Sequence, residues 1–233
     1  MKFELQAIGV MHSCFKQRFG TPKQARRAPA ARGWIEFYPP YDRAEAFVGL
    51  DGFSHLWVLF LFHENLDKEV QLSVQPPHAD GATYGLWASR SPNRPSGIGQ
   101  SLVTLEGMET DKGKVRLHVK GIDLIEGTPV IDVKPYLPYV DAIPDARSAF
   151  LPQTPEPQFE VVFSPQVEQR LTGLEENYRD LRQLIIEVLQ HDPRPPELRN
   201  AGRRIFTLPL YDLTLRVKIL DPAHITVTEV APA

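Results

Sequence analysis

The first 145 residues contain no amphipathic helical pattern, which leaves few folds open to this part of the chain. Short apolar segments separated by turn residues occupy it instead, as β-strands do. Parallel strands need crossover helices, so we expect an antiparallel barrel or a strongly bent sheet. The expected strands cover residues 3–10, 34–38, 55–63, 84–89, 101–106, 115–121 and 130–133.

Two of these strands differ in the expected solvent exposure of their two faces. Val115, Leu117 and Val119 alternate with polar residues, which is the period of a strand with one wet face. Residues 56–62 are apolar throughout, so a central strand is expected there.

Prolines interrupt any regular element between the two halves of the chain. They stand at positions 144, 152, 155, 157 and 165. We therefore predict a β-barrel domain over residues 1–145, a proline-rich linker over 146–164 and a small α+β domain over 165–233.

The last segment carries a helical signal followed by strands. Ser164 and Pro165 predict a helix start, with a break near residues 177–180. Residues 204–210, 213–220 and 225–230 predict a small sheet. One helical face is apolar and is assigned to the core rather than to a cofactor: Val167, Leu171, Leu174, Tyr178, Leu181, Ile185 and Val188.

Composition excludes several classes of protein. No apolar run of roughly 18 residues and no signal-peptide pattern occurs, so a cytoplasmic protein without membrane segments is expected. Cys14 is the single cysteine, which excludes an internal disulfide and a multi-thiolate zinc site and favours a packed thiol over a nucleophile. His55 and His63 lack a third ligand, so no metal site is predicted.

The net charge of -3 conceals two basic stretches. They would suit phosphate contacts if both face the same way, although a solvated surface is the simpler explanation. The stretches contain Lys2, Lys16, Arg18, Lys23, Arg26, Arg27 and Arg32, and then Arg194, Arg199, Arg203, Arg204, Arg216 and Lys218.

Residues 90–99 combine Arg90, Arg94, two prolines and two glycines in a short loop. Prolines stiffen such a loop, while glycines let a ligand approach the backbone. Fixed guanidinium groups suit an anionic or carboxylate-bearing ligand. From the residues alone, ligand binding and simple chain reversal are equally good explanations.

Four ordered segments resemble the TrmO (TsaA-like, YaeB) family. Residues 90–99 are similar to its RSPxRPNPIG loop, and residues 123–139 match its longest signature. The segments 8–24 and 51–63 are similar to its opening motif and its central strand. The chain departs from the family pattern at Lys23, Ser96, Gly97 and Gln100.

The resemblance implies a homodimer of small β-barrels that binds S-adenosylmethionine near the subunit interface. The implied reaction is methylation of N6 of N6-threonylcarbamoyladenosine at tRNA position 37, with the anticodon stem-loop as partner. The cofactor contacts carry over to Pro22, Lys23, Gln24, His63, Glu64, Arg90, Gln100, Lys120, Gly121, Ile122 and Asp123.

The same resemblance directs attention to carboxy-terminal residues for the chemistry. Asp192 and Tyr211 are candidates for removing the proton from N6, although a turn role for Asp192 is equally good. Arg194 and Arg94 are expected partners of the threonyl carboxylate. The rivals are a non-enzymatic RNA-binding barrel, a methyltransferase of this family with another substrate, and, more distantly, a metal-dependent hydrolase.

Overall fold

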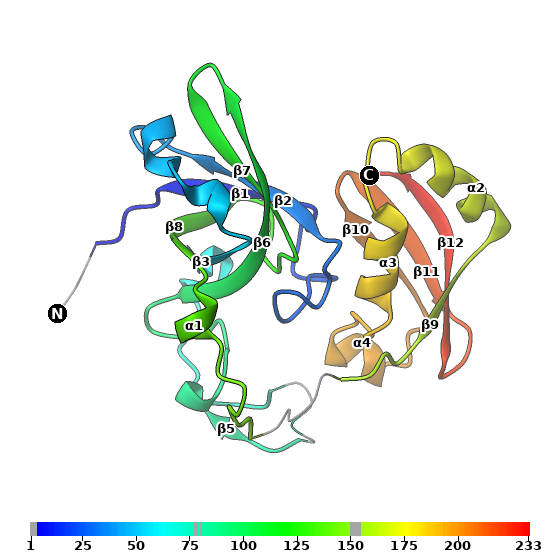
Figure 1. Cartoon of the computed structure of the whole chain (residues 1–233). Coiled ribbons are helices and arrows are strands. Elements are labelled where there is room, and N and C mark those ends of the chain that lie inside the picture. The colour runs from blue at the N-terminus through cyan, green and yellow to red at the C-terminus, as the bar shows by residue number, and fades with distance from the viewer. Residues whose placement is uncertain (1–3, 77–78, 80, 150–154) are drawn as a thin grey trace.

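The computed structural model describes residues 4–76, 79, 81–149 and 155–233. Six strands close into a barrel in the order β1-β2-β7-β6-β3-β8 (Figure 1). Each neighbouring pair is antiparallel, so the antiparallel barrel predicted from the absence of crossover helices is confirmed. The strands are β1 (Gly9–Ser13), β2 (Arg32–Phe37), β3 (His55–Leu61), β6 (Ile98–Asp111), β7 (Lys114–Lys120) and β8 (Thr128–Pro135).

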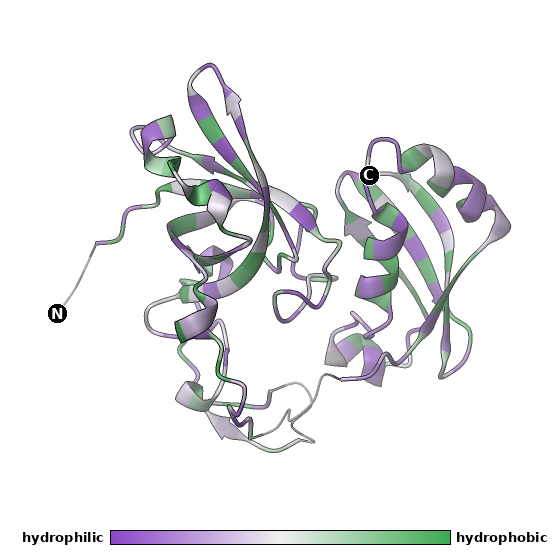
Figure 2. Cartoon of the chain, in the orientation of Figure 1, coloured by the Kyte–Doolittle hydropathy of each residue, from purple (hydrophilic) through white to green (hydrophobic). Residues whose placement is uncertain are grey.

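Alternate side chains of the barrel strands fill its interior. Leu56 and Val58 of β3 are fully buried, and β3 lies between β6 and β8, although every strand of a closed barrel has two neighbours and the residues between the buried ones are partly exposed. Leu117 and Val119 of β7 are also fully buried, while His118 between them keeps contact with solvent. Figure 2 shows the resulting alternation of hydrophilic and hydrophobic residues along the strands.

The predicted strand over residues 84–89 was wrong. Only β5 (Tyr84–Gly85) is extended, and it pairs with β4 (Ser73–Val74) outside the barrel. The 3-10 helix η4 (Leu86–Ala88) follows, in which Trp87 is 77% exposed. The apolar residues of this segment therefore do not alternate toward a shared core, which a barrel strand requires.

The other strand bounds shift at their ends. β1 covers residues 9–13 instead of 3–10, and residues 1–3 lie outside the described residues. β6 continues past the expected end through an irregularity between Leu105 and Gly107, and forms with β7 the long hairpin at the top of Figure 1. The remaining short elements are η1 (Ala44–Phe47), η2 (Leu50–Gly52), η3 (His63–Asn65) and α1 (Pro138–Asp141).

A second sheet forms the carboxy-terminal part, in the order β10-β11-β12-β9. β10 (Ile205–Leu210), β11 (Leu213–Ile219) and β12 (His224–Pro232) agree closely with the predicted strands. β9 (Glu160–Phe163) runs parallel to β12 and falls in the segment predicted as a linker, of which residues 150–154 are not described. The exact domain bounds therefore stay a prediction.

Helices α2 (Pro165–Leu174) and α3 (Leu181–Leu189) lie alongside this sheet, and the short α4 (Pro196–Asn200) precedes β10 in the chain (Figure 1). The Ser164 hydroxyl accepts a hydrogen bond from the Val167 amide, so Ser164 caps α2 as predicted. Leu171, Leu181 and Ile185 are fully buried, which confirms that the apolar stripe belongs to the core.

The segment after β1 packs against the carboxy-terminal sheet. The rings of Phe19 and Phe206 lie 5.6 Å apart, and the Tyr211 amide donates to the Cys14 carbonyl oxygen over 2.6 Å. Burial raises the pKa of the Cys14 thiol to about 12, so this thiol is a packing group, as expected. Within the described ranges, no helix is both long and apolar enough to cross a membrane.

Candidate functional site

Three of the predicted cofactor residues meet at one place, although they come from three separate motifs. Arg90 donates a hydrogen bond to the side-chain oxygen of Gln24 over 2.5 Å. Asp123 accepts a hydrogen bond from the Ser101 hydroxyl over 2.6 Å and another from the Ala25 amide. Gln24 is the residue before Ala25, so these contacts join the two pairs into one cluster of Gln24, Arg90 and Asp123.

The electrostatics of the cluster centre on Asp123. Desolvation by burial raises the pKa of its carboxyl to about 6, against the opposing effects of the Ser101 hydroxyl, the Ala25 amide and the Arg90 charge. The side chain nevertheless keeps some solvent exposure. A partly accessible carboxylate in a desolvating environment is suited to a cationic or hydrogen-bond-donating ligand group.

The turn at Gly121 holds the neighbouring predicted residues. Gly121 has a φ of +72°, and its carbonyl oxygen accepts a hydrogen bond from the Arg26 amide over 2.8 Å. Ile122 is fully buried, so its side chain belongs to the core and only its backbone is available to a ligand. Lys23 lies near the charges of Arg18 and Arg199, but burial is the main reason its pKa is lowered.

A hydrogen-bonded chain links the opening motif to the His63 segment. Arg18 donates to the Glu64 carboxylate over 2.7 Å and to the Asn65 side chain over 2.5 Å. Asn65 in turn donates to Asn93 of the arginine-proline loop. This chain fixes η3, which contains His63. Gln100 is exposed on β6, beside the buried Ser101 that contacts Asp123.

The three predicted catalytic residues lie in the carboxy-terminal part. Asp192 is buried at a φ of +46°, and both of its oxygens accept hydrogen bonds from Arg194 over 2.8 Å. Arg194 also donates to the Arg203 carbonyl oxygen. Burial raises the pKa of Tyr211 above its ordinary value. Among the described residues, no hydrogen bond or ion pair joins these three residues to the cluster of Gln24, Arg90 and Asp123, and their catalytic role stays a prediction.

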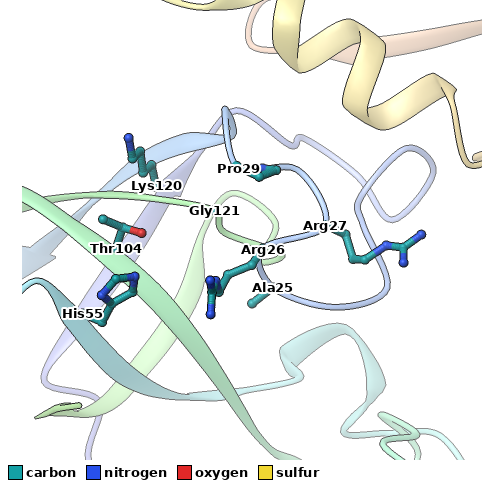
Figure 3. Close-up of a pocket in the computed structure, with 8 residues that line it drawn as sticks. All are labelled: Ala25, Arg26, Arg27, Pro29, His55, Thr104, Lys120 and Gly121. Carbon is teal, nitrogen blue, oxygen red and sulfur yellow. The ribbon is translucent and has the colours of Figure 1, made fainter. Parts of the chain in front are cut away.

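A pocket of about 430 Å³ borders the cluster of Gln24, Arg90 and Asp123, because its lining includes Ala25, which follows Gln24 and bonds to Asp123. Figure 3 shows the lining residues. Sequence reasoning singled out Lys120 and Gly121 in its wall but did not combine Arg26 with His55, which come from distant segments. In the sequence, Arg26 is one of several residues of a basic stretch. The lining residues are Ala25, Arg26, Arg27, Pro29, His55, Thr104, Lys120 and Gly121.

A second pocket, of about 350 Å³, lies between the loop of Arg26 and Arg27 and helix α3. It contains two carboxylates, Glu156 and Glu187. Glu187 is buried and accepts a hydrogen bond from the Ala30 amide over 2.8 Å, so it helps to hold α3 against the barrel. In the part of the chain that the structure describes, no group of three histidine, cysteine or acidic side chains is suited to hold a metal ion.

Comparison with known proteins covers both halves of the chain. The family model of the tRNA-methyltransferase O N-terminal domain matches residues 10–142, and that of the TrmO C-terminal domain matches residues 156–233. A protein of Escherichia coli named tRNA (adenine(37)-N6)-methyltransferase is 38% identical over 94% of each chain.

Two further similarities come from Pseudomonas aeruginosa. RcsF, named as a candidate S-adenosylmethionine-dependent methyltransferase, is 41% identical over 99% of each chain. The crystal structure of TrmO from that organism superposes with a TM-score of 0.81 at 39% identity and covers 99% of each chain.

Proposed function

The chain belongs to the TrmO family, and on that premise we propose that it transfers a methyl group from S-adenosylmethionine to N6 of an adenosine in tRNA. The observation that carries this proposal is the cluster of Gln24, Arg90 and Asp123, which three separate motifs build together. The combination of a guanidinium, an amide and a desolvated carboxylate in one place supports a ligand site here.

The chemistry of this donor set fits S-adenosylmethionine. Arg90 is suited to the cofactor's carboxylate, and Asp123 to its ammonium group or ribose hydroxyls. Pro22, Lys23, Glu64, Gln100 and the backbone of residues 120–122 would complete the site, with His63 held in place by η3. When bound, the cofactor supplies an electrophilic methyl group on a sulfonium.

The proposed substrate atom is N6 of N6-threonylcarbamoyladenosine at tRNA position 37. This nitrogen is urea-like and needs a proton acceptor or a charge-stabilising contact before it can attack. Asp192 is the proposed acceptor. The raised pKa of Tyr211 favours a hydrogen-bond donor over a base at that position.

The anticodon stem-loop is the proposed part of tRNA that is bound, with arginines recognising the threonyl carboxylate. Among the described residues, Arg94 makes one side-chain hydrogen bond, of 3.4 Å to the Ser89 carbonyl oxygen, and its guanidinium lies over the Trp87 ring, so it keeps N–H donors for a ligand. Arg194 would have to share its guanidinium between this carboxylate and Asp192.

The proposal includes a homodimer and action in the cytoplasm, where tRNA is modified. Exposed apolar side chains around α1 support a self-association surface, because monomers seldom expose such groups together. Tyr139 is 84% exposed, and Val140 and Ile143 are 56% and 65% exposed. Light scattering of the wild-type protein and of Tyr139→Glu tests this part: a dimer that the substitution dissociates is expected.

The test of the whole function is methyl transfer from labelled S-adenosylmethionine to tRNA, read by mass analysis of the nucleosides. We expect label on N6-threonylcarbamoyladenosine and none on tRNA that lacks this modification. Cofactor binding with label on another nucleoside would favour a family member with a different substrate. RNA binding without cofactor binding would favour a non-enzymatic barrel and overturn the proposal.

A further inference from the structure

We propose that Arg26 and His55, with Lys120 and the Thr104 hydroxyl at the edges, form a binding pocket for one oxyanion of the RNA substrate. The oxyanion is either a backbone phosphate or the carboxylate of the modified base, and in the second case Arg26 takes the place of Arg94 and Arg194 as the partner of that carboxylate. This inference rests on the proposed function. It concerns the 430 Å³ pocket, which borders the cluster of Gln24, Arg90 and Asp123 without including any of those three residues.

The charge of the pocket lining points to an anion. Arg26, Arg27, His55 and Lys120 line it, and none of the lining residues is acidic. The second pocket contains Glu156 and Glu187, so positive charge without a carboxylate distinguishes the first pocket from its neighbour. Oxyanions bind strongly to such groups, because each hydrogen bond is also a charge interaction.

The backbone holds Arg26 in place and leaves its side chain free. Its amide donates to the Gly121 carbonyl oxygen over 2.8 Å at a φ of +65°, a conformation that non-glycine residues seldom adopt. Among the described residues, its guanidinium has no hydrogen-bond or ion-pair partner. Figure 3 shows the Arg26 side chain on the His55 side of the loop and Arg27 on the other side.

His55 lines the same pocket as Arg26, and its Nε2 is a donor there in the tautomer whose Nδ1 accepts from the Ser54 hydroxyl. Its Nδ1 lies 2.9 Å from the Ser54 hydroxyl, which leaves Nε2 for the pocket. Both side chains line the same pocket, and burial, and then the charge of Arg26, lower the pKa of His55. A neutral imidazole whose Nδ1 accepts from Ser54 presents an N–H at Nε2.

Lys120 contributes less than Arg26. Its ammonium lies 3.8 Å from the Glu106 carboxylate, which Arg32 also engages. Lys120 therefore adds positive charge at the rim, while Arg26 supplies the free forked donor that a phosphate or carboxylate needs.

The experiment measures fluorescence anisotropy of two anticodon stem-loop RNAs, one unmodified and one threonylcarbamoylated, over a range of salt concentrations. The variants are Arg26→Gln, which keeps the stem of the side chain, and His55→Gln. Arg43→Ala is the control, since the Arg43 side chain is 67% exposed and its one ion pair among the described residues is with Glu45. Calorimetric titration with S-adenosylmethionine accompanies each variant.

We expect Arg26→Gln to weaken RNA binding about ten-fold and His55→Gln less, with cofactor affinity unchanged. If the anion is a phosphate, both RNAs lose affinity equally. The slope of log binding constant against log salt concentration then becomes less steep by about one. If it is the carboxylate, only the modified RNA loses affinity. Arg26→Lys should restore part of the loss.

Three results would overturn the pocket: Arg26→Gln binds both RNAs like the wild type, it loses cofactor affinity to the same extent, or the wild type binds neither RNA. Methyl transfer is not part of this readout. A wild-type protein that binds RNA but methylates none would count against the proposed function alone.

Discussion

The guanidinium of Arg90 donates to the side-chain oxygen of Gln24 over 2.5 Å, although 66 positions separate the two residues in the chain. The contact ties the arginine-proline loop to the segment that follows β1. Because Asp123 bonds to the adjacent Ala25, the same contact fixes the position of the guanidinium relative to a carboxylate. A ligand with separated negative and positive groups can contact both.

Arg90→Ala should weaken binding of S-adenosylmethionine about ten-fold, because the proposed charge-assisted hydrogen bond from the guanidinium to the cofactor's carboxylate is lost. Isothermal titration calorimetry measures this, with Arg43→Ala as the matched control on the exposed surface. Gln24→Ala should have a smaller effect, because it removes the support of Arg90 and leaves the charge. Wild-type affinity in Arg90→Ala would remove this residue from the site.

Asp123→Asn should be more stable than the wild type at neutral pH. Burial raises the pKa of Asp123 from 3.8 to about 6, so the folded state disfavours the charged form. The free energy of unfolding of the wild type should therefore fall as pH rises from about 4 to about 6, because ionised Asp123 costs stability in the folded protein. This cost is absent below that pH window and constant above it. Its size is of the order of 2 kcal/mol, since the carboxyl keeps some contact with solvent.

Urea denaturation at several pH values compares the two proteins, and their difference isolates Asp123 from the other carboxyls. An asparagine oxygen can still accept from Ser101. The same variant should bind S-adenosylmethionine more weakly, because a charge complementary to the ammonium group is lost. Parallel pH profiles in the two proteins would show that Asp123 is not the desolvated group.

The fold could be predicted where the sequence pattern was long and periodic. The alternation around Leu117 and the apolar run of β3 indicate which side chains are buried, and they do so without knowledge of the strands that pair with them. Strand β9 has only four residues, and its pairing with β12 depends on a partner more than 60 positions away. Residues 84–89 have a strand-like composition, but no neighbouring strand is left to pair with them in the closed barrel.

The candidate site could be predicted only through motifs. Gln24, Arg90 and Asp123 each belong to a segment that resembles the family, and their meeting agrees with that resemblance. The pairing of Arg26 with His55 had no such signal, because it depends on the loop before β2 reaching the first residue of β3. A run of basic residues indicates charge, but it does not show which guanidinium lacks a partner.

Arg194→Ala should lower the free energy of unfolding by about 3 kcal/mol. Arg194 and Asp192 form an ion pair whose side chains are only 11% and 1% exposed, so removing the arginine leaves an unpaired buried carboxylate. Thermal denaturation measures the loss, and Arg170→Ala on the exposed face of α2 is the control.

The double variant Asp192→Ala with Arg194→Ala separates stability from catalysis. It should recover much of the stability, because no unpaired charge remains. If the pair takes part in methyl transfer, turnover stays low in the recovered protein while cofactor affinity is normal. Turnover that returns together with stability would assign the pair a purely structural role.

Gly20→Ala should loosen the contact between the segment after β1 and the carboxy-terminal sheet. Gly20 has a φ of +90°, and a Cβ there would lie 2.3 Å from Cδ1 of Leu208, which is fully buried. Gly113→Ala is a matched control, since its φ is +81° and no atom lies within 4 Å of its Cβ position. Both variants should lose about 1 kcal/mol from backbone strain.

Gly20→Ala should lose a further 1–3 kcal/mol or so, because Leu208 has to move within a packed core. It should also bind S-adenosylmethionine more weakly, since Pro22 and Gln24 follow directly in the displaced segment. Adding Leu208→Ala to Gly20→Ala would relieve the clash but leave the affinity low if the sheet positions the cofactor loop. Equal losses in the Gly20 and Gly113 variants would mean that Gly20 serves only its turn, and that the loop reaches its position without support from the sheet.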